Sequence, residues 1–144
     1  MAGHSECGMK IRVQDGLPFI SATVNHRGQA LTLNQVLVDT GSMGTIFSVD
    51  KLAEIGVELE MQDSLEQIRG VGGIEFVFTK RIDRISANDL TVADFEVEVG
   101  AMNYGFNIEG IVGMDFLTQT RAIVDLAELE LYTTKRQDAL AQGG

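Results

Sequence analysis

The residues with the clearest chemical potential are Asp39, Thr40 and Gly41, which directly follow the apolar run at residues 36–38. A strand that apolar is expected to be buried, so a carboxylate at its end must be hydrogen-bonded or carry a raised pKa. Thr40 offers a hydroxyl beside it, and Gly41 lets the backbone turn tightly. The alternative is a strand that ends in an Asx-type turn, because Asp, Thr, Gly and Ser are common turn residues.

Two further segments bear on that choice. Residues 70–73, Gly-Val-Gly-Gly, lie between two strand-like runs. No helix and no Lys-Ser or Lys-Thr pair follows them, so neither nucleotide-phosphate motif fits, and a hairpin lid fits better. In the second segment, residues 110–117, two β-branched residues precede Gly113, which predicts a buried strand that turns sharply into a short helix.

In this order the three segments resemble the retropepsins, the single-domain aspartic proteases. The matching motifs are Asp39-Thr40-Gly41, the glycine-rich residues 70–73, and Ile111-Val112-Gly113. The resemblance extends over about residues 17–133. It implies that Asp39 is the catalytic carboxylate, that residues 70–73 form a flap over the cleft, and that Ile111-Val112-Gly113 packs beneath the catalytic loop.

One departure from the retroviral members is informative. They carry an Asp after the catalytic triplet and an Arg after the hydrophobic pair plus Gly, and the two form an ion pair. Here both positions are Met, Met43 and Met114. Replacing both partners of such a pair with apolar groups can be nearly neutral, which suggests a Met–Met contact. Gly113-Met114-Asp115-Phe116-Leu117 resembles cellular and bacterial relatives, and Asp115 is interpreted as a helix-end charge rather than a second catalytic acid.

The elements that must position these residues read mostly as strands. Residues 95–99 and 128–131 alternate apolar and acidic side chains, which predicts strands with one face on a core. Further strands are predicted at residues 18–24, 30–38, 74–79 and 121–125, and short helices at 48–56 and 113–119. The predicted fold is all-β, a small closed acid-protease barrel with a Gly-rich flap hairpin and one or two short helices.

The chain is expected to form one domain. Its 144 residues suit a single core, and we predict a flexible leader at residues 1–10, a retropepsin-like domain at 11–133 and a flexible tail at 134–144. With 11 Lys and Arg against 21 Asp and Glu, the net charge is −10, which argues against a nucleic-acid partner.

Several other classes are set aside. No apolar run reaches the roughly 20 residues of a membrane span. A single Cys, Cys7, cannot form an intramolecular disulfide, and two His cannot build a convincing zinc site. We therefore expect no metal and no cofactor. The absence of an export signal and the single Cys indicate the cytoplasm.

The resemblance implies a mechanism that needs two carboxylates, and Asp-Thr-Gly occurs once in the chain. The chemistry then requires a homodimer that acts on an extended peptide, with one Asp39 from each subunit. Thr40 is expected to brace the two loops and Gly41 to contact the substrate. The substrate-binding candidates are Ser42, Gly70, Val71, Gly72, Gly73, Ile74 and Ile111, with Thr45 and Ile46 as further candidates for the pocket walls, although Ile46 and Ile111 suit core packing equally.

Two alternatives stay open: a catalytically silent retropepsin-like module that binds peptides or mediates dimerisation, and a monomeric β-barrel adaptor in which the motifs are turns. The charge of −10 per subunit would make two copies repel, so association and activity are expected to strengthen with salt and acid.

Overall fold

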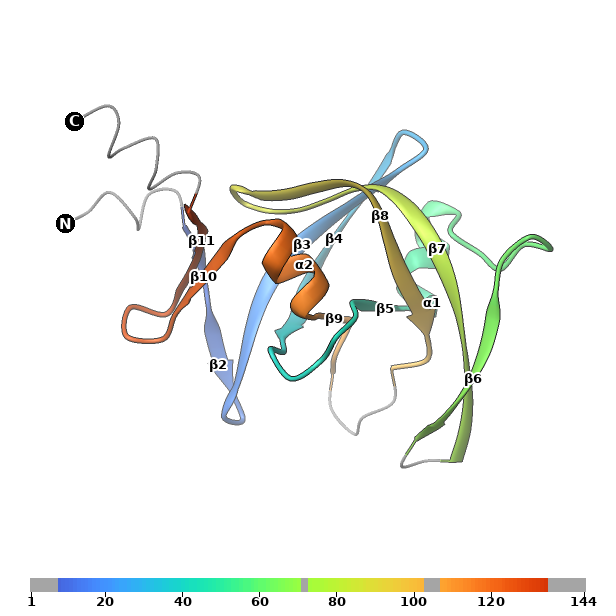
Figure 1. Ribbon diagram of the computed structural model, residues 1–144, viewed down its shortest axis with the longest axis horizontal. Coiled ribbons are helices and arrows are strands. Elements are labelled where there is room, and N and C mark those ends of the chain that lie inside the picture. Colours follow the sequence, from blue (N-terminus) through green and yellow to red (C-terminus); the bar gives the residue numbers. More distant parts are fainter. Residues whose placement is uncertain (1–7, 71–72, 103–106, 135–144) are drawn as a thin grey trace.

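The computed structural model describes residues 8–70, 73–102 and 107–134 (Figure 1). The described residues form mostly strands, with two small helical segments. The strands are β1 (Met9–Lys10), β2 (Arg12–Gln14), β3 (Leu17–His26), β4 (Gln29–Val38), β5 (Ile46–Ser48), β6 (Leu65–Gly70), β7 (Gly73–Ala87), β8 (Leu90–Gly100), β9 (Gly110–Val112), β10 (Ala122–Asp125) and β11 (Glu130–Thr133). The helical segments are α1 (Val49–Leu52), which continues into the 3-10 turn η1 (Ala53–Ile55), and α2 (Met114–Gln119).

An eight-stranded sheet forms the body of the molecule, in the order β2-β3-β4-β9-β5-β8-β7-β6. A further pairing between β3 and β7 closes the inner strands of this sheet into a ring. The strand β2 extends the ring at one end, and β6 continues it at the other as one arm of the β6–β7 hairpin. Figure 1 shows this hairpin projecting away from the ring at the lower right. The predicted all-β architecture is confirmed.

A second, three-stranded sheet lies beside the ring and pairs β1, β11 and β10 in that order. Both pairings are antiparallel, and they bring the two ends of the described chain to the same side of the molecule (Figure 1). The helix α2 connects β9 of the ring to β10 of this sheet (Figure 1). The helix that follows β9 is therefore anchored at its far end in a sheet that contains the first and the last strand, β1 and β11.

Alternating side chains build the core, as the sequence pattern of β8 illustrates. Phe95, Val97 and Val99 are buried, whereas Glu96 is exposed and Glu98 is partly exposed. The pleat of a strand sends successive side chains to opposite faces, so this alternation fills the ring interior with apolar groups. The largest fully buried side chains include Phe19, Phe47, Phe116, Ile20, Leu33, Leu52, Ile82, Ile85, Leu90 and Leu131.

Both predicted helices are present. Ser48 caps α1 by accepting a hydrogen bond from the Lys51 N–H at 3.4 Å, and Gly56 ends η1 in the left-handed conformation. The prediction for residues 128–131 is partly wrong. Leu129 lies in the turn before β11, and Glu130 is only 5% exposed although the alternation placed it toward solvent. All four residues of β11 are buried, so both faces of this strand are covered and its side chains do not alternate in burial.

Some predictions concern residues that the structure leaves undescribed. The predicted leader at residues 1–10, which contains Cys7, and the predicted tail at 134–144 lie for the most part outside the described residues. Residues 71 and 72, at the tip of the β6–β7 hairpin, lie outside them as well. Within residues 8–70, 73–102 and 107–134, no helix has the length and apolar character needed to cross a lipid bilayer.

Candidate active site

Asp39 lies immediately after β4, at the point where three strands of the ring meet. Strand β4 pairs in parallel with β9, with Val38 opposite Val112, and β9 pairs antiparallel with β5. The Asp39 N–H donates to the Val112 carbonyl oxygen at 3.0 Å and so continues the β4–β9 ladder by one residue. The backbone of Asp39 is thus fixed by a buried strand, while its side chain is only partly buried.

The turn after Asp39 is tight and uses the carboxylate itself. The Gly41 N–H donates to Asp39 Oδ1 at 2.9 Å, and the Ser42 N–H donates to the Asp39 carbonyl oxygen at 3.2 Å. A Cβ atom on Gly41 would lie 3.2 Å from Asp39 Oδ1, which is a tight contact. The absence of a side chain at Gly41 therefore allows its backbone to approach the carboxylate. Thr40 and Gly41 are exposed on the surface beside it.

The rest of this loop folds back onto the start of α2. The Met114 N–H donates to the Ser42 carbonyl oxygen at 2.7 Å, and the Asp115 N–H donates to the Met43 carbonyl oxygen at 3.2 Å. Gly113 sits between the two segments, where a Cβ atom would lie 2.4 Å from the Gly44 carbonyl oxygen. A side chain at residue 113 would therefore force the loop and the helix apart.

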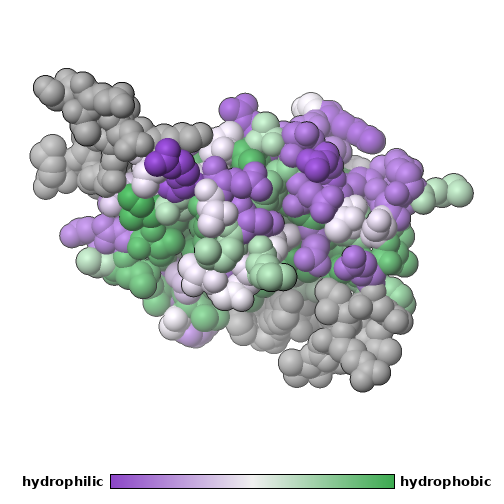
Figure 2. Space-filling view, viewed as in Figure 1, coloured by the Kyte–Doolittle hydropathy of each residue, from purple (hydrophilic) through white to green (hydrophobic). Residues whose placement is uncertain are grey.

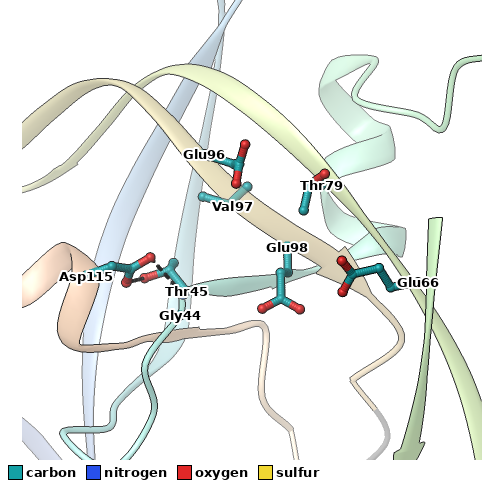
Figure 3. Close-up of a pocket in the computed structure, with 8 residues that line it drawn as sticks. All are labelled: Gly44, Thr45, Glu66, Thr79, Glu96, Val97, Glu98 and Asp115. Atoms are coloured by element: carbon teal, nitrogen blue, oxygen red, sulfur yellow. Dashed lines mark hydrogen bonds between the residues drawn. The ribbon is translucent and has the colours of Figure 1, made fainter. Parts of the chain in front are cut away.

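Thr45 and Asp115 join the same two segments through their side chains (Figure 3). The Thr45 hydroxyl donates to Asp115 Oδ1 at 2.7 Å, and the Thr45 N–H donates to Asp115 Oδ2 at 3.3 Å. The same hydroxyl accepts the Gly113 N–H at 3.1 Å. Thr45 is only 1% exposed, so its hydroxyl makes these bonds out of contact with solvent.

Comparisons with known proteins identify the family of the chain. The family model described as aspartyl protease matches residues 20–116, which include the Asp39 loop, β9 and the start of α2. The chain belongs to the aspartyl protease family. The fold also resembles the crystal structure of a retropepsin-like aspartic protease from Rickettsia conorii, with a TM-score of 0.64 and 17% sequence identity. The alignment covers 86% of this chain and 96% of that one. No curated protein matches the chain.

The protein carries an acidic pocket of about 270 Å³ beside the Asp39 loop. Its lining includes four carboxylates, those of Glu66, Glu96, Glu98 and Asp115 (Figure 3). Burial raises the pKa of Glu98, and the nearby charges of Glu66 and Asp115 raise it further. In the part of the chain that the structure describes, no three His, Cys, Asp or Glu side chains gather in a way that could hold a metal ion.

A buried lysine holds the base of the β6–β7 hairpin. Lys80 of β7 is 7% exposed, and its Nζ lies 2.5 Å from Glu60 Oε1 and 2.7 Å from Asp63 Oδ2. Hydrogen bonds from Lys80 lower the pKa of both carboxyls. Burial opposes the charge on Lys80, but the two ion pairs outweigh it and raise the pKa of the ammonium group. Two ion pairs therefore join the segment before β6 to strand β7.

The structure brings part of the predicted site together. Asp39, Thr40, Gly41 and Ser42 form one loop, and Ile111 lies next to it because it is opposite Leu37 in β4 and Ile46 in β5. Gly70 and Gly73 are opposite each other at the end of the β6–β7 pairing, and Ile74 follows in β7. Val71 and Gly72 lie outside the described residues, so the flap contacts predicted for residues 70–74 stay predictions.

The expected contact between Met43 and Met114 is wrong for a single chain. Their backbones approach through the loop–helix hydrogen bonds, but Met43 is 87% exposed and Met114 is 40% exposed. The two side chains therefore do not form a buried apolar pair in place of an ion pair. They leave apolar surface next to the Asp39 loop instead.

Three features of the site were missed from the sequence. The bonds of Asp115 to Thr45 carry no local pattern, because the two residues are 70 positions apart. The buried position of Lys80 had a signal, since it alternates with Phe78 and Ile82, which are both buried. Extending the predicted strand past residue 79 would have placed Lys80 on the inner face. The position of Glu98 between two other carboxylates depends on the tertiary fold.

Proposed function

We propose that this protein is an aspartic endopeptidase that works as a homodimer, with Asp39 of each subunit forming a shared pair. One observation carries the proposal: Asp39 sits at the end of a buried strand in a tightly bonded loop, and the chain contains that Asp-Thr-Gly triplet once. Membership of the aspartyl protease family supports the reaction class. A second copy of the chain supplies the second carboxylate.

The chemistry follows from two carboxylates at close distance. Like charges that close cannot both ionise cheaply, so the pair holds one proton between them. The ionised carboxylate takes a proton from a water molecule, whose oxygen attacks the peptide carbonyl carbon. The protonated carboxyl gives its proton to the carbonyl oxygen. The resulting tetrahedral intermediate then breaks the C–N bond: the leaving amine takes a proton from one carboxyl, and a hydroxyl of the intermediate returns its proton to the ionised carboxylate as the carbonyl re-forms, so the pair again holds one proton.

Exposed apolar side chains in two places support association with a second copy. Met43 and Met114 lie beside the Asp39 loop, and Leu126 and Leu129 lie in the turn between β10 and β11. Figure 2 shows hydrophobic side chains gathered over the β10–β11 region on the left of the viewed face. Burial of such surface favours association, whereas the charge of −10 per chain opposes it. Salt and mild acid are therefore expected to strengthen the dimer.

The substrate in this proposal is an extended peptide. Gly41 lies exposed next to Asp39, where an extended chain could pass close to the backbone. The β6–β7 hairpin is the element proposed to close over that peptide, with residues 70–74 adding strand-like hydrogen bonds and excluding water. Ser42 and Ile111 are proposed to contact the same peptide on the side opposite the hairpin.

The experiment that tests this proposal combines sedimentation velocity with digestion of a peptide library at mildly acidic pH. It compares the wild type, Asp39→Asn and a control, Asp94→Asn, which changes an exposed Asp paired with Arg81 on the surface. We expect all three to sediment as dimers, and cleavage to fall by about a thousandfold or more only in Asp39→Asn. A dimer of the wild type that cleaves nothing would favour a silent module, and cleavage that persists in Asp39→Asn would exclude the shared pair.

A further inference from the structure

The loop that carries Asp39 serves as the cap of α2. The first N–H groups of a helix have no partner within the helix. Here the Gly113 N–H donates to Thr45 Oγ1, and the N–H groups of Met114 and Asp115 donate to carbonyl oxygens of Ser42 and Met43. The loop and the helix start are therefore one bonded unit, and a change in either moves the other.

Thr45 is the point where the side-chain bonds of this unit converge. Its hydroxyl uses its one proton on Asp115 Oδ1 and one lone pair on the Gly113 N–H. Because Thr45 is 1% exposed, water cannot easily replace either bond. Removing the hydroxyl would leave a buried N–H and a carboxylate oxygen with weaker partners, which is costly.

The carboxylate of Asp115 is committed to the same unit. Its Oδ1 accepts the Thr45 hydroxyl and, at 2.7 Å, the Phe116 N–H, while its Oδ2 accepts the Thr45 N–H. Both oxygens therefore have donors from the loop or the helix. This arrangement suits a group that holds other groups in place rather than one that transfers protons to a substrate.

We propose that Asp115 and Thr45 are positioning residues, which set the Asp39 loop at the depth and angle that the shared carboxylate pair requires. The proposal rests on the proposed function above and adds residues that do not touch the substrate. The requirement is strict because symmetry repeats any displacement of the loop in the second subunit, so the two carboxylates shift together. A displacement of about 1 Å can lower an enzymatic rate by roughly a hundredfold.

The test compares two substitutions at Thr45 that differ in the hydroxyl. Thr45→Val keeps the shape of the side chain and removes the hydroxyl, whereas Thr45→Ser keeps the hydroxyl. Thr118→Val is the matched control. It removes a hydroxyl from α2, and that hydroxyl donates to the backbone carbonyls of Met114 and Asp115 rather than to the loop. The measurements are kcat and KM on a cleaved peptide, and amide hydrogen exchange at residues 42–45 and 113–116.

We expect Thr45→Val to lower kcat by at least about tenfold with KM changed less than about threefold, and to speed exchange at both segments. Thr45→Ser should restore kcat to within about threefold of the wild type, and Thr118→Val should leave it unchanged. A kcat for Thr45→Val within about twofold of the wild type would overturn the positioning role. So would an equal loss in Thr45→Ser, because the hydroxyl would then not be the group that matters.

Two further arms cover the remaining outcomes. Asp115→Asn keeps one oxygen as an acceptor, so it tests the same unit if Thr45→Val does not fold, and we expect a smaller loss of kcat than in Asp115→Ala. Equal kcat in these two variants would contradict the proposal.

If the wild type cleaves no peptide, the proposed function fails, and hydrogen exchange alone decides whether Thr45 holds the loop and the helix start together. Faster exchange at residues 42–45 in Thr45→Val but not in Thr118→Val would support the unit, and unchanged exchange would reject it.

Discussion

The Asp39 loop and the β6–β7 hairpin are held in place by different forces. The loop is fixed to β9 and α2 by hydrogen bonds from consecutive backbone groups and by the buried hydroxyl of Thr45. The hairpin pairs along β7, but the segment that leads into β6 is attached through the ion pairs of Lys80 with Glu60 and Asp63. Figure 1 shows the loop between β4 and β5 close to the start of α2, whereas the hairpin projects from the ring.

The difference fits the separate roles proposed for the two regions, a fixed position for Asp39 and a movable hairpin over the substrate. The backbone hydrogen bonds that tie this loop to β9 and α2 leave little room for alternative positions, which would suit the proposed pairing of Asp39 with its symmetric copy. Among the described strands, β6 pairs with β7 alone, so the hairpin has fewer neighbours than the strands of the ring. Elements that close over ligands are generally drawn from such less stable parts of a fold.

The largest effect is expected from Gly113→Ala, which acts on the packed region. The added methyl would lie 2.4 Å from the Gly44 carbonyl oxygen and 2.7 Å from the Ser42 carbonyl oxygen, and neither backbone group can move aside freely. We expect kcat to fall by about a hundredfold, measured on a cleaved peptide. The control is Gly44→Ala, where the nearest atom is the flexible Glu98 carboxylate at 3.2 Å. An equal or greater loss in Gly44→Ala would show that the close approach at Gly113 is not what matters.

The second prediction compares two phenylalanines in the two regions. Phe116 of α2 is 0% exposed and contacts Phe95 edge-on, with ring centroids 6.2 Å apart, whereas Phe76 in the hairpin is 57% exposed. Phe116→Ala should lower the free energy of unfolding by about 3–5 kcal/mol, because it leaves a cavity. Phe76→Ala should lower it by less than about 1 kcal/mol. Urea unfolding of both variants tests the contrast, and similar losses would count against it.

The third prediction concerns the charge that holds the hairpin base. Lys80→Met removes the cation between Glu60 and Asp63, which leaves Glu60 with the longer ion pair to Arg27 at 3.8 Å and Asp63 with the Glu60 N–H. The melting temperature should fall by about 5 °C or more at neutral pH. Arg81→Met is the neighbouring control, because Arg81 is mostly exposed and its ion pair with Asp94 lies on the surface. Differential scanning calorimetry gives both values, and an equal shift in the two variants would mean that burial of Lys80 adds nothing.

The smallest effect is expected at Glu98, which lies between the two regions. Its pKa is raised above 4.5 by burial and by the charges of Glu66 in the hairpin and Asp115 in α2. The folded protein therefore loses stability as pH rises from 4.5 through the raised pKa and Glu98 ionises. Glu98→Gln should be more stable than the wild type at neutral pH by roughly half a kcal/mol, because solvent screens part of the repulsion.

That gain at Glu98 should disappear well below pH 4.5, where Glu98 is protonated in both the folded and the unfolded chain. Urea unfolding at the two pH values measures it. Glu96→Gln, two residues earlier in β8 and exposed, is the control and should change stability little at either pH. A gain from Glu98→Gln that is as large in acid as at neutral pH would contradict the electrostatic origin.

Local patterns in the sequence were enough for much of the fold. Alternation predicted the buried face at residues 95–99, and the cap at Ser48 and the glycine at residue 56 predicted the limits of the first helix. The same rule failed at Glu130, because both faces of β11 are covered in the tertiary fold. A single sequence does not show which strands flank a given strand.

The candidate site divides in the same way. The triplet at Asp39 and the strand–glycine–helix pattern at Gly113 are contiguous in sequence, and the resemblance to a known family connected them. The bonds of Thr45 to Asp115 join positions far apart in the chain, and they were not predicted. The exposure of Met43 was not predicted either. Met43 and Met114 stand where retroviral members carry an ion pair, and this suggested a contact between them within one chain.

The central claim is that two chains each supply one Asp39 to the same reaction, and a subunit-mixing experiment tests it most directly. A fixed amount of wild type is mixed with increasing Asp39→Asn under conditions that allow subunit exchange, and peptide cleavage is measured. If the pair is shared, mixed dimers are inactive, and a tenfold excess of the variant should lower activity to roughly a tenth. Activity that stays at the level of the wild type alone, although sedimentation or mass spectrometry shows mixed dimers, would mean that each chain acts by itself.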